Sequence, residues 1–472
     1  MKTRMRIEED TLGKVQVPEE AYYGIQTQRA SQSFSISGLK AHPLMVKSMI
    51  LIKKAAALSH LELGRLAKRK VDAIMKACDE ILKGKLMDQF IVDVFQMGAG
   101  TSFHMNGNEV LANRAEEILG GKRGEYRIVH PHDHVNMGQS TNDVYPAAMH
   151  LAALFLLKDL LFTALKEIED SFRAKADEFD SVIKSGRTHL QDAPPLRLGQ
   201  EFKAYAQTLA KCRAFVENAS QSLLELGLGG SAVGTGLNTI PGYSELAVKH
   251  LSRMTGFALK RAEDLREAMQ SMRPIAEVSS ALRNLALEMN RISNDLRLLS
   301  SGPKTGLAEI SLPPIAPGSS MMPGKVNPSM LEMMNMVCYQ VIGCDLVISG
   351  AVQAGQLELN VMMPVMAFNL IFMIQIMGNA LKQLKEKCID GIKANVEQCK
   401  MYAESSMGLA TALSPYLGYD RVAELAKEAF RTGKSLVEVI EEKAVFSKEE
   451  IRKILDLKRM TEPGISGKDY PK

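Results

Sequence analysis

Residues 318–328, GSSMMPGKVNP, place two serines, a lysine and an asparagine in a stretch that suits a loop. Pro323, Gly324 and Pro328 prevent a continuous helix there, and further prolines precede the segment. Loops held on a rigid scaffold often carry catalytic side chains, because a loop can move. The segment therefore predicts a mobile loop with functional side chains, with a plain surface linker as the alternative.

A second polar cluster, GQSTNDVYP at residues 138–146, stands where a long helical pattern begins. Ser140, Thr141, Asn142 and Asp143 are all residue types that cap helix N-termini, and proline is favoured in the first turn. A cap needs only one such residue, so four in succession indicate a further use. Free backbone N–H groups and the positive end of the helix dipole suit this position for binding a carboxylate.

Two further loops carry polar side chains at helix ends. GRTHLQD, residues 186–192, lies between two long helical patterns, and GAGTS, residues 98–102, precedes another. His189 taken alone is more typical of a structural hydrogen bond than of a catalytic group. Together the four loops offer hydroxyls, amides, a histidine and a lysine, but few carboxylates. That set suits a small anion better than a metal or a sugar.

Two other motifs suggest different chemistry. HPHDH at residues 130–134 looks like a metal cluster, but zinc usually takes ligands from separated places and this run has no distant partner. The glycine-rich LGLGGSAVGTG at residues 226–236 matches neither the dinucleotide nor the P-loop pattern. We expect no metal and no cofactor, and a close turn between helices at the glycine-rich segment.

The composition is that of an ordinary soluble globular protein. The chain has 472 residues, 46% of them apolar, and a net charge of +4 without clustering of Lys or Arg, which argues against nucleic acid as a partner. Its six cysteines form no CxxC pair, and no apolar stretch follows the basic residues of MKTRMRIEED. These features predict a reduced, cytoplasmic protein without a signal peptide.

The periodicity is helical almost throughout. Within residues 147–193 an apolar stripe predicts one long helix of about thirty residues, and further helical patterns, broken by short punctuation, fill 196–225, 243–300 and 330–395. No run of alternating strands is evident. The stripe consists of Leu154, Leu157, Leu161, Leu165, Ile168, Phe172 and Phe179.

Two consecutive helical segments carry almost no charge. Residues 359–381 have none, and residues 333–357 have only Asp345. The first is long enough to span a bilayer, but Pro364 and four amides within it favour burial in protein, so we expect no membrane span. The sequence predicts a mainly α fold of three helical domains. They are residues 1–142, a central long-helix domain 143–395 that forms an oligomeric bundle, and a small C-terminal domain 396–472.

The motifs, taken in order, resemble those of the class II fumarase and aspartase superfamily. GAGTS, GQSTND, GRTHLQDA, GTGLN at 234–238 and GSSMMPGKVNP all match its pattern, and the resemblance covers nearly the whole chain. AYYGIQTQRA, DQFIVDVFQMGAGTS and GQLELNVMMPV are more similar to the aspartase branch than to the class II fumarases. The resemblance implies a homotetramer whose active sites are each shared between subunits.

The resemblance also implies roles for individual residues. Ser319 is expected to be the base that removes a proton from carbon, and Glu332 to orient His189. One substrate carboxylate would be held by Thr101, Ser140, Thr141 and Ser320, the other by Thr188, Lys325 and Asn327, and the amino group would face Asn142 and His189. The implied reaction is reversible deamination of L-aspartate to fumarate and ammonia.

Two positions depart from the family pattern. His104 stands where the family commonly has Asn, and Met363 stands where aspartases commonly have Glu. Both positions bear on the choice of substrate. Three alternatives stay open: a fumarate hydratase, a non-catalytic helical scaffold and, on the histidine run, a metalloenzyme.

Overall fold

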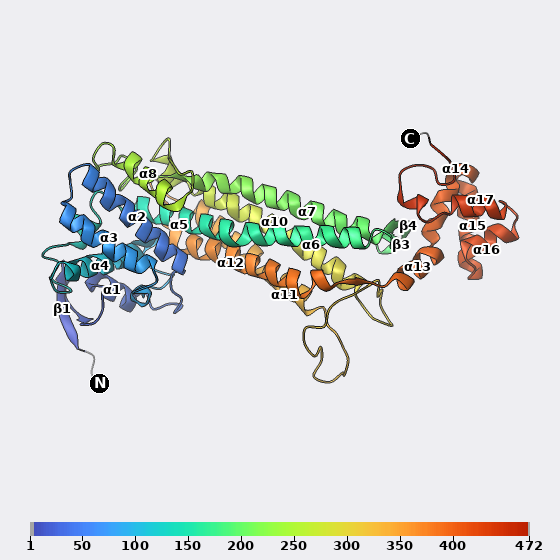
Figure 1. Ribbon diagram of the computed structural model, residues 1–472, viewed down its shortest axis with the longest axis horizontal. Helices are drawn as coiled ribbons and strands as arrows, with labels where there is room; N and C mark the ends of the chain where they lie inside the picture. The colour runs from blue at the N-terminus through green and yellow to red at the C-terminus, as the bar shows by residue number, and fades with distance from the viewer. Residues whose placement is uncertain (1–3, 471–472) are drawn as a thin grey trace. The chain divides into compact units, whose positions relative to one another are not determined.

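The computed structural model describes residues 4–470, and its secondary structure is mainly helical, as predicted (Figure 1). The helices are α1 Ile25–Ser33, α2 Pro43–Glu62, α3 Lys68–Leu82, α4 Thr101–Ile118, α5 Thr141–Leu156, α6 Phe162–Glu178, α7 Leu198–Ser220, α8 Tyr243–Thr255, α9 Glu267–Gln270, α10 Arg273–Leu299, α11 Ser329–Gln353, α12 Met363–Lys387, α13 Val396–Ser405, α14 Ser414–Leu417, α15 Tyr419–Thr432, α16 Leu436–Glu442 and α17 Lys448–Ile454.

Short strands were not expected, and here the sequence analysis is wrong. The described residues contain two-stranded sheets, antiparallel except for the parallel pair β5 and β6. The strands are β1 Met5–Asp10, β2 Gly13–Pro18, β3 Ile183–Thr188, β4 Gln191–Arg197, β5 Glu225–Leu226, β6 Lys260–Arg261, β7 Ile310–Ser311 and β8 Lys393–Ala394.

The residues fall into two compact units. Unit 1 comprises Met1–Thr163, Cys212–Leu287 and Val337–Asn379, and unit 2 comprises Ala164–Lys211, Glu288–Met336 and Ala380–Lys472. The division falls within α6, α7, α10, α11 and α12. The division into three domains that the sequence predicts is not tested by these two units and stays a prediction.

The long helix expected within residues 147–193 is present. α5 continues through one π-helical segment, Leu157–Leu161, into α6, so that helix runs from Thr141 to Glu178. Every residue of the predicted apolar stripe is buried. After residue 178 the chain leaves the helix, and β3 and β4 pair as a hairpin.

The expected helices over 243–300 and 330–395 are interrupted. α8 ends before Gly256, whose φ of 72° is left-handed, and α10 begins only at Arg273. Between α11 and α12, Asn360 Nδ2 donates to the carbonyls of Ala351 and Val352, each at 3.0 Å. These bonds end α11 at the carbonyl groups that a longer helix would use itself.

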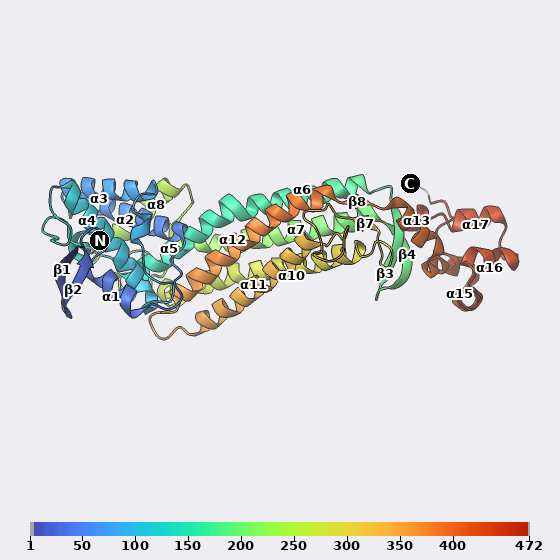
Figure 2. The ribbon, with the colours of Figure 1, turned by 90° about the horizontal axis from the view of Figure 1, so that it is seen from below.

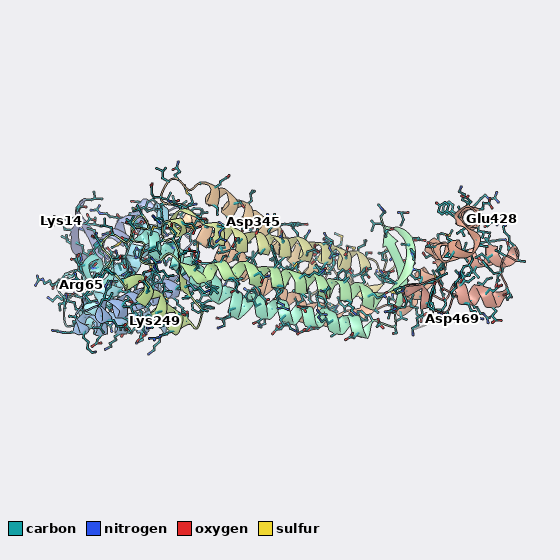
Figure 3. The ribbon with its side chains drawn as sticks, turned by 90° about the horizontal axis from the view of Figure 1, so that it is seen from above. Lys14, Arg65, Lys249, Asp345, Glu428 and Asp469 are labelled. Atoms are coloured by element: carbon teal, nitrogen blue, oxygen red, sulfur yellow. The ribbon has the colours of Figure 1, made fainter. Side chains whose placement is uncertain are left out.

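In unit 1, segments of α10, α11 and α12 pack alongside one another (Figure 2). Asp345 of α11, labelled in Figure 3, is buried and accepts a hydrogen bond of 2.6 Å from Ser279 of α10. Arg283 of α10 pairs with the same carboxylate at 3.2 Å. The only charge in residues 333–357 is therefore paired, as a buried charge must be.

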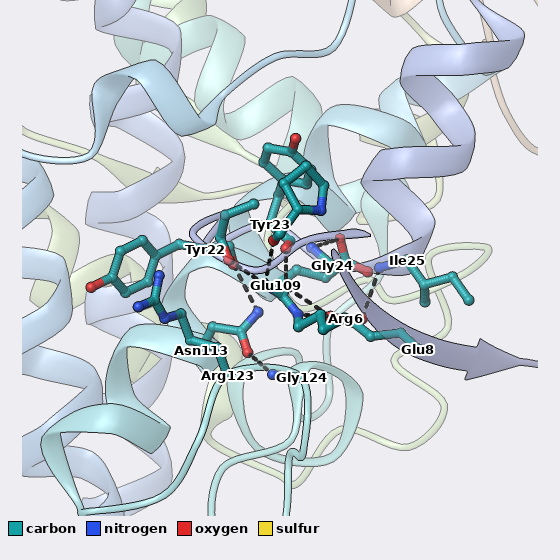
Figure 4. A network of polar contacts seen from close by, with 12 residues as sticks. Arg6, Glu8, Tyr22, Tyr23, Gly24, Ile25, Glu109, Asn113, Arg123 and Gly124 are labelled. Carbon is teal, nitrogen blue, oxygen red and sulfur yellow. Dashed lines mark hydrogen bonds and ion pairs between the residues drawn. The ribbon is translucent and has the colours of Figure 1, made fainter. Parts of the chain in front are cut away.

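A polar network fastens the N-terminal elements to α4 (Figure 4). Glu109 of α4 is buried and accepts hydrogen bonds from the backbone of Gly24, Gln26 and Thr27 and from the Thr27 hydroxyl. Arg6 of β1 donates to the carbonyl of Tyr23 at 2.7 Å. α4, which begins at Thr101, is thus tied to the N-terminal elements through Glu109.

In unit 2, aromatic side chains join α6 and α7. The rings of Phe172 and Phe202 lie 5.9 Å apart, and Phe202 also contacts Phe179. The C-terminal helices α15, α16 and α17 close over a separate apolar core that includes Leu425, Val439 and Ile451.

By length and composition alone, three helical stretches could cross a membrane: Thr141–Glu178, Ser329–Gln353 and Met363–Gly391. In the first and third, 67% of the most apolar part is buried inside the protein. In the second, Ser329–Gln353, the buried share is 39%.

Candidate active site

Ser140 caps α5 at the cluster that the sequence singled out. Its Oγ accepts a hydrogen bond of 3.2 Å from the Asn142 N–H, and its own N–H donates to Asp143 Oδ1 at 3.0 Å. This reciprocal capping box fixes the first turn of the helix. The predicted helix start is confirmed, and it leaves the positive end of a long helix beside three polar side chains.

Asp143 ties the glycine-rich segment to this helix start. It is fully buried, and its Oδ2 accepts from the N–H groups of Gly229 and Ser231, at 2.9 and 3.3 Å. Burial raises the pKa of Asp143 to about 6, although these hydrogen bonds and Lys53 lower it. The glycine-rich segment forms a close turn, as expected, because Gly229 and its neighbours lie against α5 and α8.

Asn142 has a fixed amide. Its Nδ2 donates to the carbonyl of Ala232 at 2.8 Å, so its Oδ1 is left as the acceptor. The side chain is half-buried. An amide held this way can accept a hydrogen bond from a small ligand.

Thr141 contacts His104, which the sequence singled out without this contact, and His104 in turn contacts Lys53, which sequence reasoning missed. Thr141 Oγ1 lies 2.7 Å from His104 Nδ1, and His104 Nε2 lies 2.6 Å from Lys53 Nζ. Lys53 belongs to α2, and its fully buried side chain has no motif around it. The available signal was that one of the three lysines of α2, Lys53, falls among the apolar residues of its buried face.

Thr101 is the first residue of α4. Its hydroxyl is within 3.5 Å of the Gly98 carbonyl, at the limit of a hydrogen bond. Ala99 and Gly100 both have positive φ, and a Cβ on Gly100 would meet the ring of Tyr145 at 2.1 Å. The loop GAGTS therefore requires glycine at residue 100 because it packs against α5.

Thr188 and His189 lie at the tip of the β3–β4 hairpin. Thr188 pairs with Gln191, and the two residues between them, His189 and Leu190, have φ of 55° and 59°. Two left-handed residues make this a type I′ turn, which usually takes Asn or Gly. Thr188, His189 and Leu190 are all exposed, so the turn presents the imidazole outward. The left-handed φ of His189 and Leu190 is the conformational cost.

A buried ion cluster holds the base of the hairpin. Arg187 donates to Glu309 Oε1 at 2.7 Å, and Lys184 lies 3.0 Å from Glu309 Oε2. Glu309 is fully buried and immediately precedes β7. Two cations around one buried carboxylate fix the strand that carries Thr188.

Residues 312–328 form neither helix nor strand, which confirms the predicted loop. Ser319 Oγ accepts hydrogen bonds from the N–H groups of Met321 and Met322, at 3.1 and 2.9 Å. Asn327 Nδ2 donates to the Gly318 carbonyl, and so closes the loop on itself. Lys325 and Ser320 are exposed.

Glu332 lies in the first turn of α11 and is half-buried. Within residues 4–470 no hydrogen bond or ion pair joins it to His189, so its orienting role stays a prediction. No hydrogen bond there joins the hairpin tip to residues 318–328 either. The structure thus brings together Ser140, Thr141 and Asn142 in unit 1, with Thr101 in the same unit, while Thr188, His189, Ser319, Ser320, Lys325, Asn327 and Glu332 belong to unit 2.

The histidine run has structural partners. His134 Nδ1 accepts from the His130 N–H at 2.8 Å, its Nε2 lies 2.7 Å from Lys70, and His132 Nε2 lies 2.8 Å from Gln26. Among the described residues no three His, Cys, Asp or Glu side chains converge as metal ligands would.

Comparison with known proteins gives a family. Residues 13–343 match the family model described as Lyase, and residues 409–462 match Fumarase C C-terminus. The chain is 50% identical over 468 residues to an aspartate ammonia-lyase of Bacillus sp, covering 99% of this chain and 100% of that protein. It is also 50% identical to the aspartate ammonia-lyase of Bacillus subtilis, covering 98% of each.

Solved structures share the fold. The fumarate lyase:delta crystallin from Brucella melitensis bound to cobalt has a TM-score of 0.94 and 48% identity, covering 98% of this chain and 100% of that one. The class II fumarase from Schistosoma mansoni has a TM-score of 0.95 and 37% identity, covering 97% and 99%.

Proposed function

The chain belongs to the lyase family that includes the fumarases and aspartases, and we propose that it catalyses the reversible deamination of L-aspartate to fumarate and ammonia. Relatives named aspartate ammonia-lyase are 50% identical to it over 98–99% of its length. The reaction needs a base that removes a proton from the carbon next to a carboxylate, which is a very weak acid. It also needs hydrogen-bond donors that stabilise the dianionic enediolate formed by that step.

The observation that carries the proposal is that two backbone N–H groups donate to the hydroxyl oxygen of Ser319. A serine is a poor base unless its alkoxide is stabilised. The Met321 and Met322 N–H groups already point at Ser319 Oγ, at 3.1 and 2.9 Å. Donors fixed in advance act on charge without reorganisation, which is usually the largest contribution to catalysis.

The substrate's carboxylates would be bound by two sets of donors. The hydroxyls at the helix starts, with Ser320, would take the carboxylate whose charge grows in the enediolate. Thr188, Lys325 and Asn327 would take the other one. The capped start of α5 supports the first assignment, because its hydroxyls and helix dipole both favour an anion.

The leaving group separates aspartate from malate, because the two substrates share both carboxylates. An ammonium donates hydrogen bonds and accepts none, so it requires acceptors. Asn142 Oδ1 is such an acceptor, since Nδ2 is committed to Ala232. His189 would face the same group. The alternative, a fumarate hydratase, is kept open by two departures from the family pattern, His104 and the Met363 that replaces the glutamate common in aspartases.

A paired assay of fumarate formation tests the proposal. With L-aspartate and L-malate run side by side, we expect turnover of aspartate to exceed that of malate by at least about a hundredfold, because a site fitted to one substituent leaves buried groups unpaired with the other. Preference for malate would make the protein a fumarate hydratase. No turnover of either would favour a non-catalytic scaffold.

Assembly and location are part of the same proposal. α11 exposes Met336, Tyr339 and Leu346 by 59–74% in the single chain, an apolar surface that other subunits would cover. We propose a cytoplasmic homotetramer with shared active sites, in which the long apolar helices pack in a bundle rather than in a membrane. Sedimentation that gives a stable monomer at micromolar concentration would contradict it.

A further inference from the structure

Lys53 makes three polar contacts although it is fully buried in α2. Its Nζ lies 2.6 Å from His104 Nε2 and 2.9 Å from both Asn136 Oδ1 and Gln139 Oε1. An ammonium has three N–H donors, and here each meets one acceptor. A buried polar group needs this full pairing.

The orientation of both amides is fixed by their own donors. Gln139 Nε2 donates to the Val135 carbonyl at 3.1 Å, and Asn136 Nδ2 donates to the Gln139 carbonyl at 3.2 Å. Each amide oxygen must therefore face Lys53. With those two sites occupied, the third donor of Lys53 points to His104 Nε2, which has to be the unprotonated nitrogen.

The tautomer of His104 then sets the direction of the next hydrogen bond. A neutral imidazole that accepts at Nε2 carries its proton on Nδ1, so Nδ1–H donates to Thr141 Oγ1 at 2.7 Å. Within residues 4–470 no other hydrogen bond engages that hydroxyl. The Thr141 proton is therefore free to donate outward from the start of α5.

We propose that Lys53 and His104 are positioning residues that set the Thr141 hydroxyl to donate to a substrate carboxylate. The inference rests on the proposed function, which assigns Thr141 to that carboxylate. Three donors in series, each oriented by the one behind it, present a fixed dipole to an anion while the cation itself stays out of contact. The step involves no bond change in the substrate.

Protonation of Lys53 controls the series. Burial lowers the pKa of Lys53 to about 7, opposed by the Asp143 carboxylate and the Cys78 thiol, which face it from α5 and α3. His104 is held neutral, because burial, Lys53 and His132 all lower its pKa. When Lys53 loses its proton, its amine can accept from His104 Nε2–H, and Thr141 then donates inward to Nδ1.

The sign of the pH effect follows from this reversal. Below about pH 7 Lys53 is charged and Thr141 donates outward, so a dicarboxylate binds well. As the pH rises through that value the outward donor is lost and binding weakens. Reciprocally, a bound anion raises the pKa of Lys53.

Binding of succinate, an unreactive dicarboxylate, to the full-length protein tests the proposal by calorimetry. From about pH 6.5 to about pH 8.5 we expect the affinity to fall by roughly tenfold or more, since each unit of pH is worth up to tenfold for one proton. A purely structural lysine would affect stability but would not give this pH profile.

Variants identify the groups responsible. Lys53→Met and His104→Leu should each weaken succinate binding and remove its pH dependence. His104→Gln, which offers one acceptor and one donor, should keep both. Lys54→Met is the matched control, because Lys54 is the neighbouring lysine of α2 but pairs with Asp79 instead. It should bind succinate as the unmodified protein does.

The outcomes separate this inference from the proposed function. Failure of the unmodified protein to bind succinate at any pH would count against the proposed function. Binding that does not change with pH, or pH dependence that survives in Lys53→Met or His104→Leu, would overturn the positioning role alone. If Lys53→Met does not fold, the profile of the unmodified protein and the two His104 variants decide the question.

Discussion

The start of α5 and the loop of residues 318–328 both present serine hydroxyls, yet they are held in opposite ways. At α5, Ser140 is bonded to Asn142 and Asp143, and Asp143 is buried against a neighbouring segment. The loop bonds mainly to itself, and the Met321 side chain is 87% exposed.

This difference corresponds to two tasks. Donors that stabilise charge act best when they are fixed before the reaction, as at α5. A base that must reach the substrate and then let product leave needs a segment of low local stability. In the shared active sites that we propose, the helix start would supply the rigid donors and the loop would supply the base that moves.

The largest effect is expected from Ser319→Ala. Loss of the proton-transfer group should lower turnover by about 10²–10⁴-fold. Folding should be unchanged, because Ser319 bonds only within its own loop. Steady-state kinetics with L-aspartate and a thermal melt check both statements.

Succinate binding by Ser319→Ala provides the control, since the carboxylate donors remain. Near-normal turnover in this variant would assign the base to another residue.

Asp143→Ala should act mainly on stability. It leaves the N–H groups of Ser140, Gly229 and Ser231 without their acceptor and removes half of the capping box. We expect a loss of about 2–4 kcal/mol, from a lost cap and buried donors left unsatisfied. The thermal midpoint, compared with that of Ser319→Ala, measures it. An unchanged midpoint would mean that the helix start is not rigid.

Met321→Ala should have the smallest effect. The exposed side chain contributes little to folding, so the change should stay within about 0.5 kcal/mol, and the backbone N–H to Ser319 is retained. Turnover should therefore remain close to that of the unmodified protein. A large loss of turnover would show that the loop docks through this methionine when it closes.

Local chemistry predicted both halves of the candidate site. The prolines and Gly324 indicated the loop, and the run from Ser140 to Asp143 indicated the helix start, because capping and helix breaking depend on neighbours in sequence. The β3–β4 hairpin was missed since its strand buries Lys184, which pairs with the distant Glu201 and Glu309.

Lys53 was missed for a related reason. Its partners lie 51 to 86 residues away, on α4 and in the segment before α5. The spacing of residues within α2 cannot predict contacts with partners outside it. From the sequence alone, Lys53 is simply a lysine on the apolar side of a helix. The assignments of Ser319, His189 and Glu332 came from resemblance, and their roles stay predictions until the variants are made.

The carboxylate of Glu309 also limits how the protein can be re-engineered. Because Arg187 and Lys184 share it, the hairpin of residues 183–197 and Glu309 form one module, which has to be exchanged as a whole. A chimera that takes the hairpin from a relative without its matching acid would bury the Arg187 guanidinium with no counter-charge and leave Lys184 with Glu201 alone. Libraries aimed at new amino-acid substrates should therefore vary the tip, Thr188 to Gln191, and leave the module beneath it intact.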